Sequence, residues 1–264
     1  MPSRRSLFKR AVLLLPLFQV VHPGPIVSQP PGSSSPHLPV VFEPNRGQAD
    51  GGTLFVAHTA DGTVELRQDG VTINQLTSDD AESFVLRFAG SHEAKVEEEK
   101  GKDGSSNYYF GGAVPRKLEH IPLYRRIRYA GIYPGIDAVF HGNHGKLEYD
   151  FEVSPGADPE QLRINLASNQ AATLNADGSV EIASDKHSIR LLRPKAYQPG
   201  DSGSDADVDV SYALIGPRQI GFKLVGYDAK RKLVIDPVVS YGEIIGSNNT
   251  TELHAIAVDS DGNL

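Results

Sequence analysis

Residues 147–153 read Leu-Glu-Tyr-Asp-Phe-Glu-Val, and this stretch decides the fold class. Apolar and acidic side chains alternate, so the apolar ones share one face of an extended strand and the acids share the other. Strict alternation of this kind is typical of a half-buried strand. One face therefore belongs to a hydrophobic core. The open chemical question is whether the acidic face, formed by Glu148, Asp150 and Glu152, is only solvated or is a site.

The same strand pattern continues on both sides of this stretch. Strands predicted within residues 53–76 are separated by Asp61-Gly62 and Asp69-Gly70, and such steps are typical of hairpin turns because glycine tolerates positive φ. Only residues 158–162, where Asp precedes Pro, indicate a short helical turn. Further hairpin turns are predicted at 175–178 and 216–217. The prediction is an all-β, β-sandwich-like domain of antiparallel hairpins.

Composition excludes several kinds of chemistry. The 264 residues include no Cys, so there is no disulfide framework, no thiolate metal site and no cysteine nucleophile. They also include no Trp, which is the strongest side chain for anchoring an interface. The net charge of −7 offers no electrostatic footprint for nucleic acid, so no nucleic-acid partner is expected.

The amino terminus is predicted to be an export signal, covering residues 1–30. Four basic residues among the first ten precede an apolar run at 11–21, which is shorter than the roughly 20 residues of a membrane-spanning helix. No transmembrane anchor is therefore expected. Residues 3–9 (Ser-Arg-Arg-Ser-Leu-Phe-Lys) resemble a twin-arginine signal. The expected location is periplasmic, cell-surface or extracellular.

The rest of the chain divides by composition. Residues 31–40 are a Pro/Ser linker, and residues 41–240 form the all-β domain. Two polar, Gly-containing stretches, 93–106 and 199–209, are predicted to be loops. The second of them marks a possible subdivision of the domain.

Several motifs carry a resemblance to a known bacterial family. They are Phe-Glu-Pro-Asn-Arg-Gly-Gln at 42–48, Ile-Tyr-Pro-Gly-Ile-Asp at 132–137, Pro-Gly-Ala-Asp-Pro at 155–159 and Leu-Val-Ile-Asp-Pro at 233–237, together with the strand at 147–153. The series resembles the N-terminal all-β domain of unknown function found in exported proteins with SBBP-type β-propeller repeats. Residues 255–264 look like the start of the first repeat, so 241–264 is predicted to be an incomplete propeller repeat.

The resemblance implies an envelope or surface role without an established activity. The expected function is that of an exported, non-catalytic β domain that accompanies a β-propeller and serves attachment, binding or structure. Its expected partners are its own C-terminal repeats, if the intact protein is longer, and a surface glycan or protein ligand. No cofactor is expected, apart from the calcium option below.

The alternative is an extracellular glycoside hydrolase. Glu148, Asp150 and Glu152 resemble the E-x-D-x-E signature of laminarinase-type enzymes, in which they are nucleophile, modulator and acid/base respectively. The absence of Trp counts against a polysaccharide cleft. The simpler interpretation is that the acids pair with basic residues on a neighbouring strand. The nearest such residues in sequence are Lys146, Arg125, Arg126 and Arg128.

Three weaker patterns suggest other sites. His58, Asp103 and Ser202 follow one another in the His–Asp–Ser order of trypsin-like serine proteases. Coincidence explains this order better, because a triad needs a buried carboxylate. Two stretches place potential oxygen ligands at alternating positions, as calcium-binding loops do. A hairpin turn or a solvated acidic segment explains the same pattern equally well. The calcium candidates are Asp259, Asp261 and Asn263, and Asp205, Asp207 and Asp209.

Histidines and aromatic residues complete the set of candidates. His141 and His144 flank a predicted turn and are potential metal ligands, although exposed turn histidines are usually only polar. A run of aromatic and basic residues is compatible with a binding surface, but core packing is favoured for residues on strands. This run contains Tyr108, Tyr109, Phe110, Tyr124, Arg125, Arg126, Arg128, Tyr129 and Tyr133.

Overall fold

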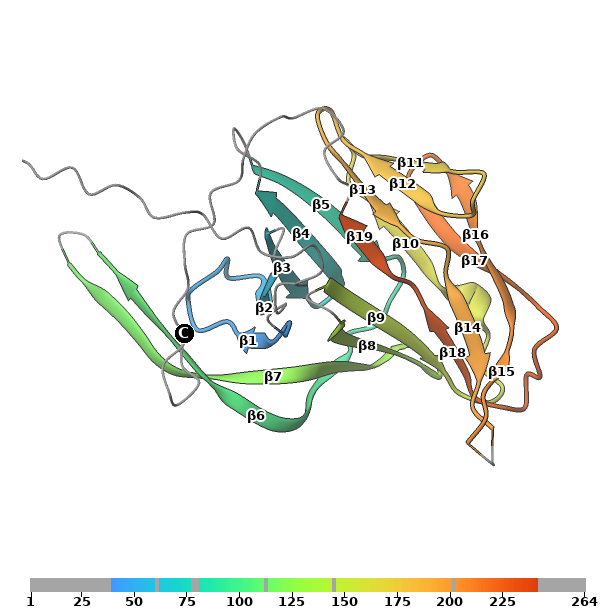
Figure 1. The fold of residues 1–264 in the computed structure, drawn as a ribbon, viewed down its shortest axis with the longest axis horizontal. Coiled ribbons are helices and arrows are strands. Elements are labelled where there is room, and N and C mark those ends of the chain that lie inside the picture. The colour runs from blue at the N-terminus through green and yellow to red at the C-terminus, as the bar shows by residue number, and fades with distance from the viewer. Residues whose placement is uncertain are drawn as a thin grey trace, which may run out of the picture. The chain divides into compact units, whose positions relative to one another are not determined.

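The computed structural model describes residues 39–59, 62–76, 81–111, 114–143, 146–200 and 203–241. This part of the chain is all-β and forms two antiparallel sheets (Figure 1). The 3-10 turn η1 (Pro159–Gln161) lies at the predicted helical turn, and Asp158 caps it through the Glu160 amide. Within the described ranges, no helix is long and apolar enough to cross a membrane. The predicted all-β fold class is confirmed, whereas the predicted propeller repeat at 241–264 lies, apart from Tyr241, outside the described residues.

The larger sheet is built mainly from successive hairpins. Its strand order is β15-β14-β18-β9-β8-β7-β1-β2-β3-β4-β5-β10-β17-β16, with β6 pairing β7. The hairpins at Asp69-Gly70 and 216–217 lie where the sequence predicts them. The strands are β1 (Phe42–Pro44), β2 (Thr53–Thr59), β3 (Gly62–Arg67), β4 (Gly70–Leu76), β5 (Ala81–Phe88), β6 (Lys95–Phe110), β7 (Arg116–Tyr133), β8 (Ile136–Asn143), β9 (Lys146–Val153), β10 (Arg163–Leu166), β14 (Lys195–Gln198), β15 (Ala206–Asp207), β16 (Asp209–Gly216), β17 (Gln219–Val225) and β18 (Leu233–Asp236).

The chain passes directly from the smaller sheet to the larger one, and back, at two short prolyl connections. Its order is β11 (Ala171–Leu174), β12 (Val180–Ala183), β13 (Ser188–Leu191) and β19 (Val239–Tyr241). β13 leads through Pro194 into β14, while β18 leads through Pro237 into β19. Since proline has no backbone N–H for a strand ladder, these two residues mark where the paired strands change sheets.

Both sheets bury their apolar faces in one core. The core contains Val180, Ile182 and Ile189 of the smaller sheet together with strands of the larger sheet. Its aromatic centre contains Phe151, which lies edge-to-face against Phe88, Tyr149 and Phe222 at centroid distances of 5.5–5.8 Å. The apolar face of β9 therefore lies at the centre of this core.

The structure corrects one predicted loop. Residues 93–106 were expected to be irregular, but Lys95–Phe110 is the long strand β6, paired along β7. Arg126 and Arg128 of β7 bind the Glu99 carboxylate, so cross-strand ion pairs stabilise this charged strand. The register of β6 against β7 shifts between Glu99 and Lys102 and again between Lys102 and Ser105.

The second predicted loop, 199–209, has a more regular end than expected. It connects β14 to β15 and β16, and β15 turns back to pair with β14. β18, which follows this segment in the chain, pairs with β14 and β9, which precede it. Both sides of the segment therefore belong to the same large sheet.

Candidate functional site

The acidic face of β9 is partly buried. The side chains of Glu148, Asp150 and Glu152 are only 14–18% exposed, because neighbouring strands place polar side chains against them. Leu147 and the other apolar residues of β9 point to the opposite, buried face, as the alternation predicts. Acids this enclosed require partners, since an unpaired buried charge is costly.

Glu152 belongs to a closed network of ion pairs. Its Oε2 accepts hydrogen bonds from Arg128 Nη1 at 3.0 Å and from Lys232 Nζ at 2.8 Å. Arg128 also binds Asp137 Oδ2 at 2.9 Å and the carboxylate of Glu99. Since Arg126 also pairs with Glu99, three cations and three carboxylates take part, and they include the pairing with Arg128 that the sequence suggested.

The network determines how Glu152 titrates. Burial by itself raises the pKa of this carboxyl, but the hydrogen bonds from Arg128 and Lys232 outweigh burial and lower it. The pKa of Arg128 is raised, chiefly by its hydrogen bond to Glu152. A general acid of a glycosidase needs the opposite shift, because it must hold a proton near neutral pH. The environment of Glu152 therefore favours an ion-pairing role.

Around Asp150, the acidic face is less completely paired. His141 of β8 lies between two carboxylates, with Nε2 3.0 Å from Asp150 Oδ2 and Nδ1 3.9 Å from Glu148 Oε2. Asp236 of β18 faces the same group, and its Oδ1 atom is buried without a hydrogen-bond partner. The pKa of Asp236 is raised, first by burial and then by repulsion from Asp150 and Glu148.

The histidine of the protease-like pattern has a structural partner instead. His58 Nε2 lies 2.9 Å from the Tyr108 hydroxyl, which donates to Glu43 Oε2 at 2.7 Å. Glu43 is only 3% exposed, so this chain of contacts satisfies a buried carboxylate across β1, β2 and β6. The side chain of Asp103 and the whole of Ser202 lie outside the described residues.

The calcium and histidine candidates divide between described and undescribed residues. Asp259, Asp261, Asn263 and His144 lie outside the described residues. Asp205 precedes β15, Asp207 is on β15, and Asp209 begins β16 and pairs with Arg193 at 3.7 Å. In the described ranges, no group of three or more His, Cys, Asp or Glu side chains is arranged to hold a metal ion.

The aromatic run is mainly structural. Tyr129 and Tyr133 of β7 are 0% and 4% exposed, and the Tyr133 hydroxyl donates to the carbonyl of Ala89. Tyr124 packs partly buried against the core, whereas Tyr109 of β6 is 72% exposed. Core packing, which the strand pattern favoured, is confirmed for the β7 tyrosines.

Local geometry explains the sequence motifs around the site. Asn45 organises the turn after β1, accepting from the Gly47 amide and donating to the Thr53 carbonyl. Gly135 has φ +73°, and a Cβ there would lie 2.8 Å from the Cβ of Ala157, so the β7–β8 turn and the turn after β9 pack against each other. These motifs specify turns and contacts rather than a reactive group.

Two further residues line the polar face, although no sequence pattern pointed to them. Asp236 and Lys195 lie opposite each other on β18 and β14, next to the β9 acids. Asp236 is part of the motif at 233–237, but its position beside Asp150 depends on pairing between segments about eighty residues apart. Composition and spacing alone contain no signal for that pairing.

Fold and site together define an all-β domain with an enclosed, largely ion-paired polar face. Residues 42–238 match the family model described as "Domain of unknown function (DUF7948)", and the chain belongs to this family. Comparisons with curated proteins and with solved structures gave no match. The family match confirms that these residues form a domain of unknown function.

Proposed function

We propose that residues 42–241 form a non-catalytic β domain of an exported bacterial protein, which holds a downstream SBBP-type β-propeller and serves attachment or binding. The observation that carries this proposal is the last strand within the described residues. β19 pairs with β13 through Tyr241, where the repeat-like sequence begins. A propeller that follows would thus continue from a strand fixed in the smaller sheet. The basic and apolar start of the chain supports export.

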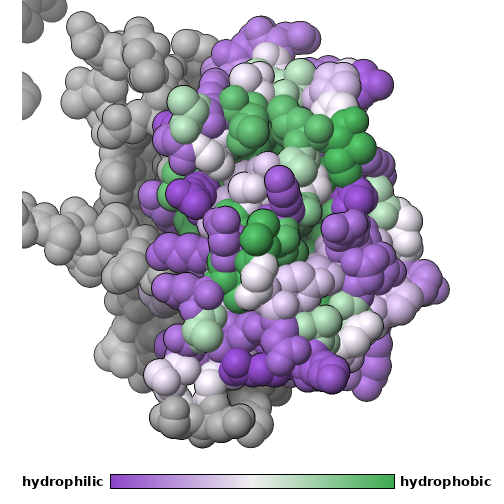
Figure 2. Space-filling view, turned by 90° about the vertical axis from the view of Figure 1, so that its right-hand side faces the viewer, coloured by the Kyte–Doolittle hydropathy of each residue, from purple (hydrophilic) through white to green (hydrophobic). Residues whose placement is uncertain are grey.

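An exposed apolar surface supports the binding role. Leu174 of β11 is 45% exposed, and Leu214 and Ile215 of β16, which packs beside β11, are 37% and 50% exposed. Figure 2 views the molecule from the side of β16 and β17 and shows apolar residues gathered in the upper part of that face. Grouped exposed apolar side chains are typical of contact surfaces.

The proposal is tested first by the intact mass of the exported, purified product of the whole gene. The expected product starts near residue 25–40 and continues well beyond Leu264 into further repeats. A mature product that ends at Leu264 would overturn the propeller part, because one blade fragment cannot bury its own faces.

The hydrolase alternative is tested on the same product with a panel of β-glucans. We expect no hydrolysis by the parent chain. Measurable hydrolysis that is abolished in both Glu148→Gln and Glu152→Gln would overturn the non-catalytic proposal, provided that both variants show the parent's circular dichroism spectrum. Glu65→Gln, a substitution of another partly buried acid that pairs with Arg67, is the matched control.

A further inference from the structure

The far end of the β6–β7 hairpin presents apolar side chains to solvent. Figure 1 shows this hairpin extending past β1 and β2. Val114, between the two strands, is 85% exposed, and Tyr109 of β6 is 72% exposed. They are the two most exposed large apolar side chains of the described residues. We define the hairpin tip as residues 109–111 and 114–117.

Each of the last two rungs of the hairpin joins one aromatic ring to one cation. Phe110 pairs with Arg116, and Tyr109 pairs with Lys117. Since successive residues of a strand point to opposite faces, each face of the tip carries one ring and one cation. Arg116 Cζ lies 4.2 Å from the centroid of the Phe110 ring, in cation–π contact. Apolar surface and positive charge are therefore combined on both faces.

The tip is basic although the chain as a whole is acidic. Residues 107–118 include Arg116 and Lys117 but no acid, whereas the whole chain has a net charge of −7. Lys117 pairs with Glu119 at 2.8 Å, but this pair is exposed and therefore weak. Arg116 forms no ion pair within the described part of the chain, and its Nη2 donates to the Gly47 carbonyl at 2.9 Å.

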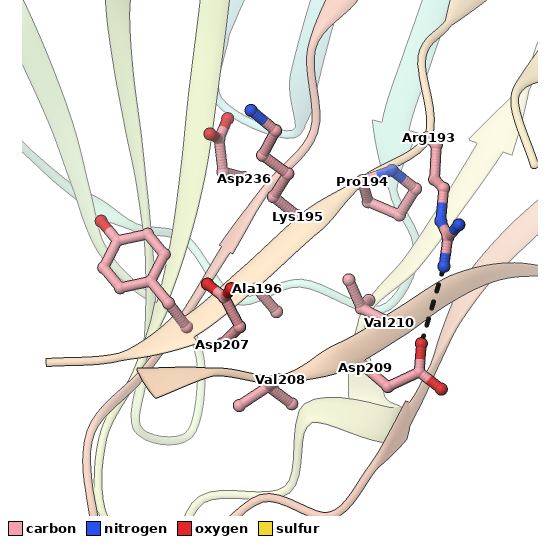
Figure 3. A pocket seen from close by; sticks show the side chains of 10 residues that line it. Arg193, Pro194, Lys195, Ala196, Asp207, Val208, Asp209, Val210 and Asp236 are labelled. Carbon is pink, nitrogen blue, oxygen red and sulfur yellow. Dashed lines mark ion pairs between the residues drawn. The ribbon is translucent and has the colours of Figure 1, made fainter. Parts of the chain in front are cut away.

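A cavity elsewhere on the surface shows how neighbouring acids neutralise such cations. It has a volume of about 340 Å³, lies beside β14, and is lined by two cations and three acids (Figure 3). The dashed line in Figure 3 marks the pair of Arg193 with Asp209, at 3.7 Å. This lining offers no excess of positive charge. At the hairpin tip, by contrast, the charge of Arg116 is available to an anionic partner.

The base of the tip is fixed to the body of the domain. The Tyr108 hydroxyl donates to Glu43 Oε2 at 2.7 Å and lies 2.9 Å from His58 Nε2. Glu43 is only 3% exposed, so the hairpin is held to β1 and β2 through a buried carboxylate. A tip held in this way loses less conformational freedom when it binds a partner.

We propose that the hairpin tip inserts into the headgroup region of a bilayer that contains anionic phospholipids. Val114 and the two rings enter the boundary between headgroups and acyl chains, where aromatic side chains are favoured. Arg116 and Lys117 meet the lipid phosphates. The two residues of each strand beyond the Tyr108 rung span about 7 Å, which matches the roughly 5–10 Å depth of interfacial segments. Insertion stays shallow, because the backbone of a turn would be unsatisfied in hydrocarbon.

A lipid surface fits the tip better than a protein partner does. A stable protein interface buries about 800 Å² on each side, whereas the tip offers two strongly exposed apolar side chains at the end of one hairpin. The inference specifies the attachment role proposed above and rests on it, but it does not depend on whether propeller repeats follow.

The test uses the absence of Trp from the chain. Val114→Trp places a single tryptophan at the tip, and Leu214→Trp places one on the exposed apolar surface of β16 as the matched control. Both 264-residue variants are mixed with vesicles of brominated phosphatidylcholine and phosphatidylglycerol in a ratio of about 3:1, at low salt. We expect the Val114→Trp fluorescence to shift to the blue and to fall by about half or more, and the control to change by less than about a tenth. Because bromine quenches only nearby rings, binding through residues 1–30 does not produce this signal.

Two double variants in the Val114→Trp background test the assigned cations. Arg116→Gln with Lys117→Gln should weaken vesicle binding at least about fivefold, since each cation near an anionic surface contributes about that factor. Arg218→Gln with Lys223→Gln removes the same charge from exposed positions beside β17 and should leave binding within about twofold of the parent.

Three outcomes would overturn the proposal: an unquenched tryptophan in Val114→Trp, equal quenching in Leu214→Trp, or equal weakening by the two double variants. An unquenched tip would leave this surface to a protein contact. All of these outcomes leave the intact-mass test of the propeller proposal unaffected.

Discussion

The two ends of the acidic face of β9, one around Glu152 and one around Asp150 and Asp236, contain similar residues but differ in how their hydrogen bonds are satisfied. Around Glu152, Arg128 pairs with Glu99, Asp137 and Glu152, and Lys232 pairs with Glu152 as well. At Asp236, on the adjacent strand β18, one carboxylate oxygen is buried without a hydrogen-bond partner. A satisfied network stabilises the fold, whereas a buried carboxylate oxygen without a donor lowers the stability of the folded state.

The largest expected effect comes from removing the cation at the centre of the closed network. Arg128→Met should lower the free energy of unfolding by about 2–3 kcal/mol, because three partly buried carboxylates lose their shared partner. Urea unfolding at pH 7 measures the change. The control is Arg87→Met, which breaks an exposed pair with Asp69 and should cost less than about 1 kcal/mol. Equal losses of unfolding free energy in the two variants would show that the network stabilises the fold no more than an exposed ion pair does.

A smaller effect, with a defined pH dependence, is expected for Glu152→Gln. The pKa of Glu152 is lowered in the folded state, so its charge contributes stability above its unfolded value of 4.5, and this contribution is lost as pH falls through the lower folded value. The variant should lose about 1–2 kcal/mol at pH 7. The difference from the parent chain should shrink below pH 4.5, as followed by unfolding at several pH values. A difference that stays constant with pH would contradict the ion-pairing assignment.

The smallest effect is expected at Asp236 and has the opposite sign. The pKa of Asp236 is raised in the folded state by burial and by its acidic neighbours, so its ionised form opposes folding at neutral pH. Asp236→Asn should therefore raise the free energy of unfolding by a fraction of a kcal/mol at pH 7. The gain should disappear as pH falls through the raised folded pKa and towards the unfolded value of 3.8. A loss of stability at pH 7 would indicate that Asp236 is as fully paired as Glu152.

The fold class could be predicted from sequence because it depends on local patterns. Alternation at 147–153 specifies a strand with one buried face, and Asp69-Gly70 specifies a hairpin, each within a few residues. The charged stretch from Lys95 was misjudged because its strand conformation depends on Arg126 and Arg128, about thirty residues further along the chain. Local composition indicated solvation, but long-range pairing supplied the counter-charges.

The sequence by itself determined the alternation, the turns and the presence of acids on one face of β9. Only the tertiary structure decided which acids are paired: it places Lys232 against Glu152 and Asp236 beside Asp150. It also decided that β15 returns to pair with β14, where the Val208 amide donates to the Ala196 carbonyl. The physical reason is that turns and alternation arise from neighbouring residues, whereas the balance of charge and hydrogen bonding is set by strands distant in sequence.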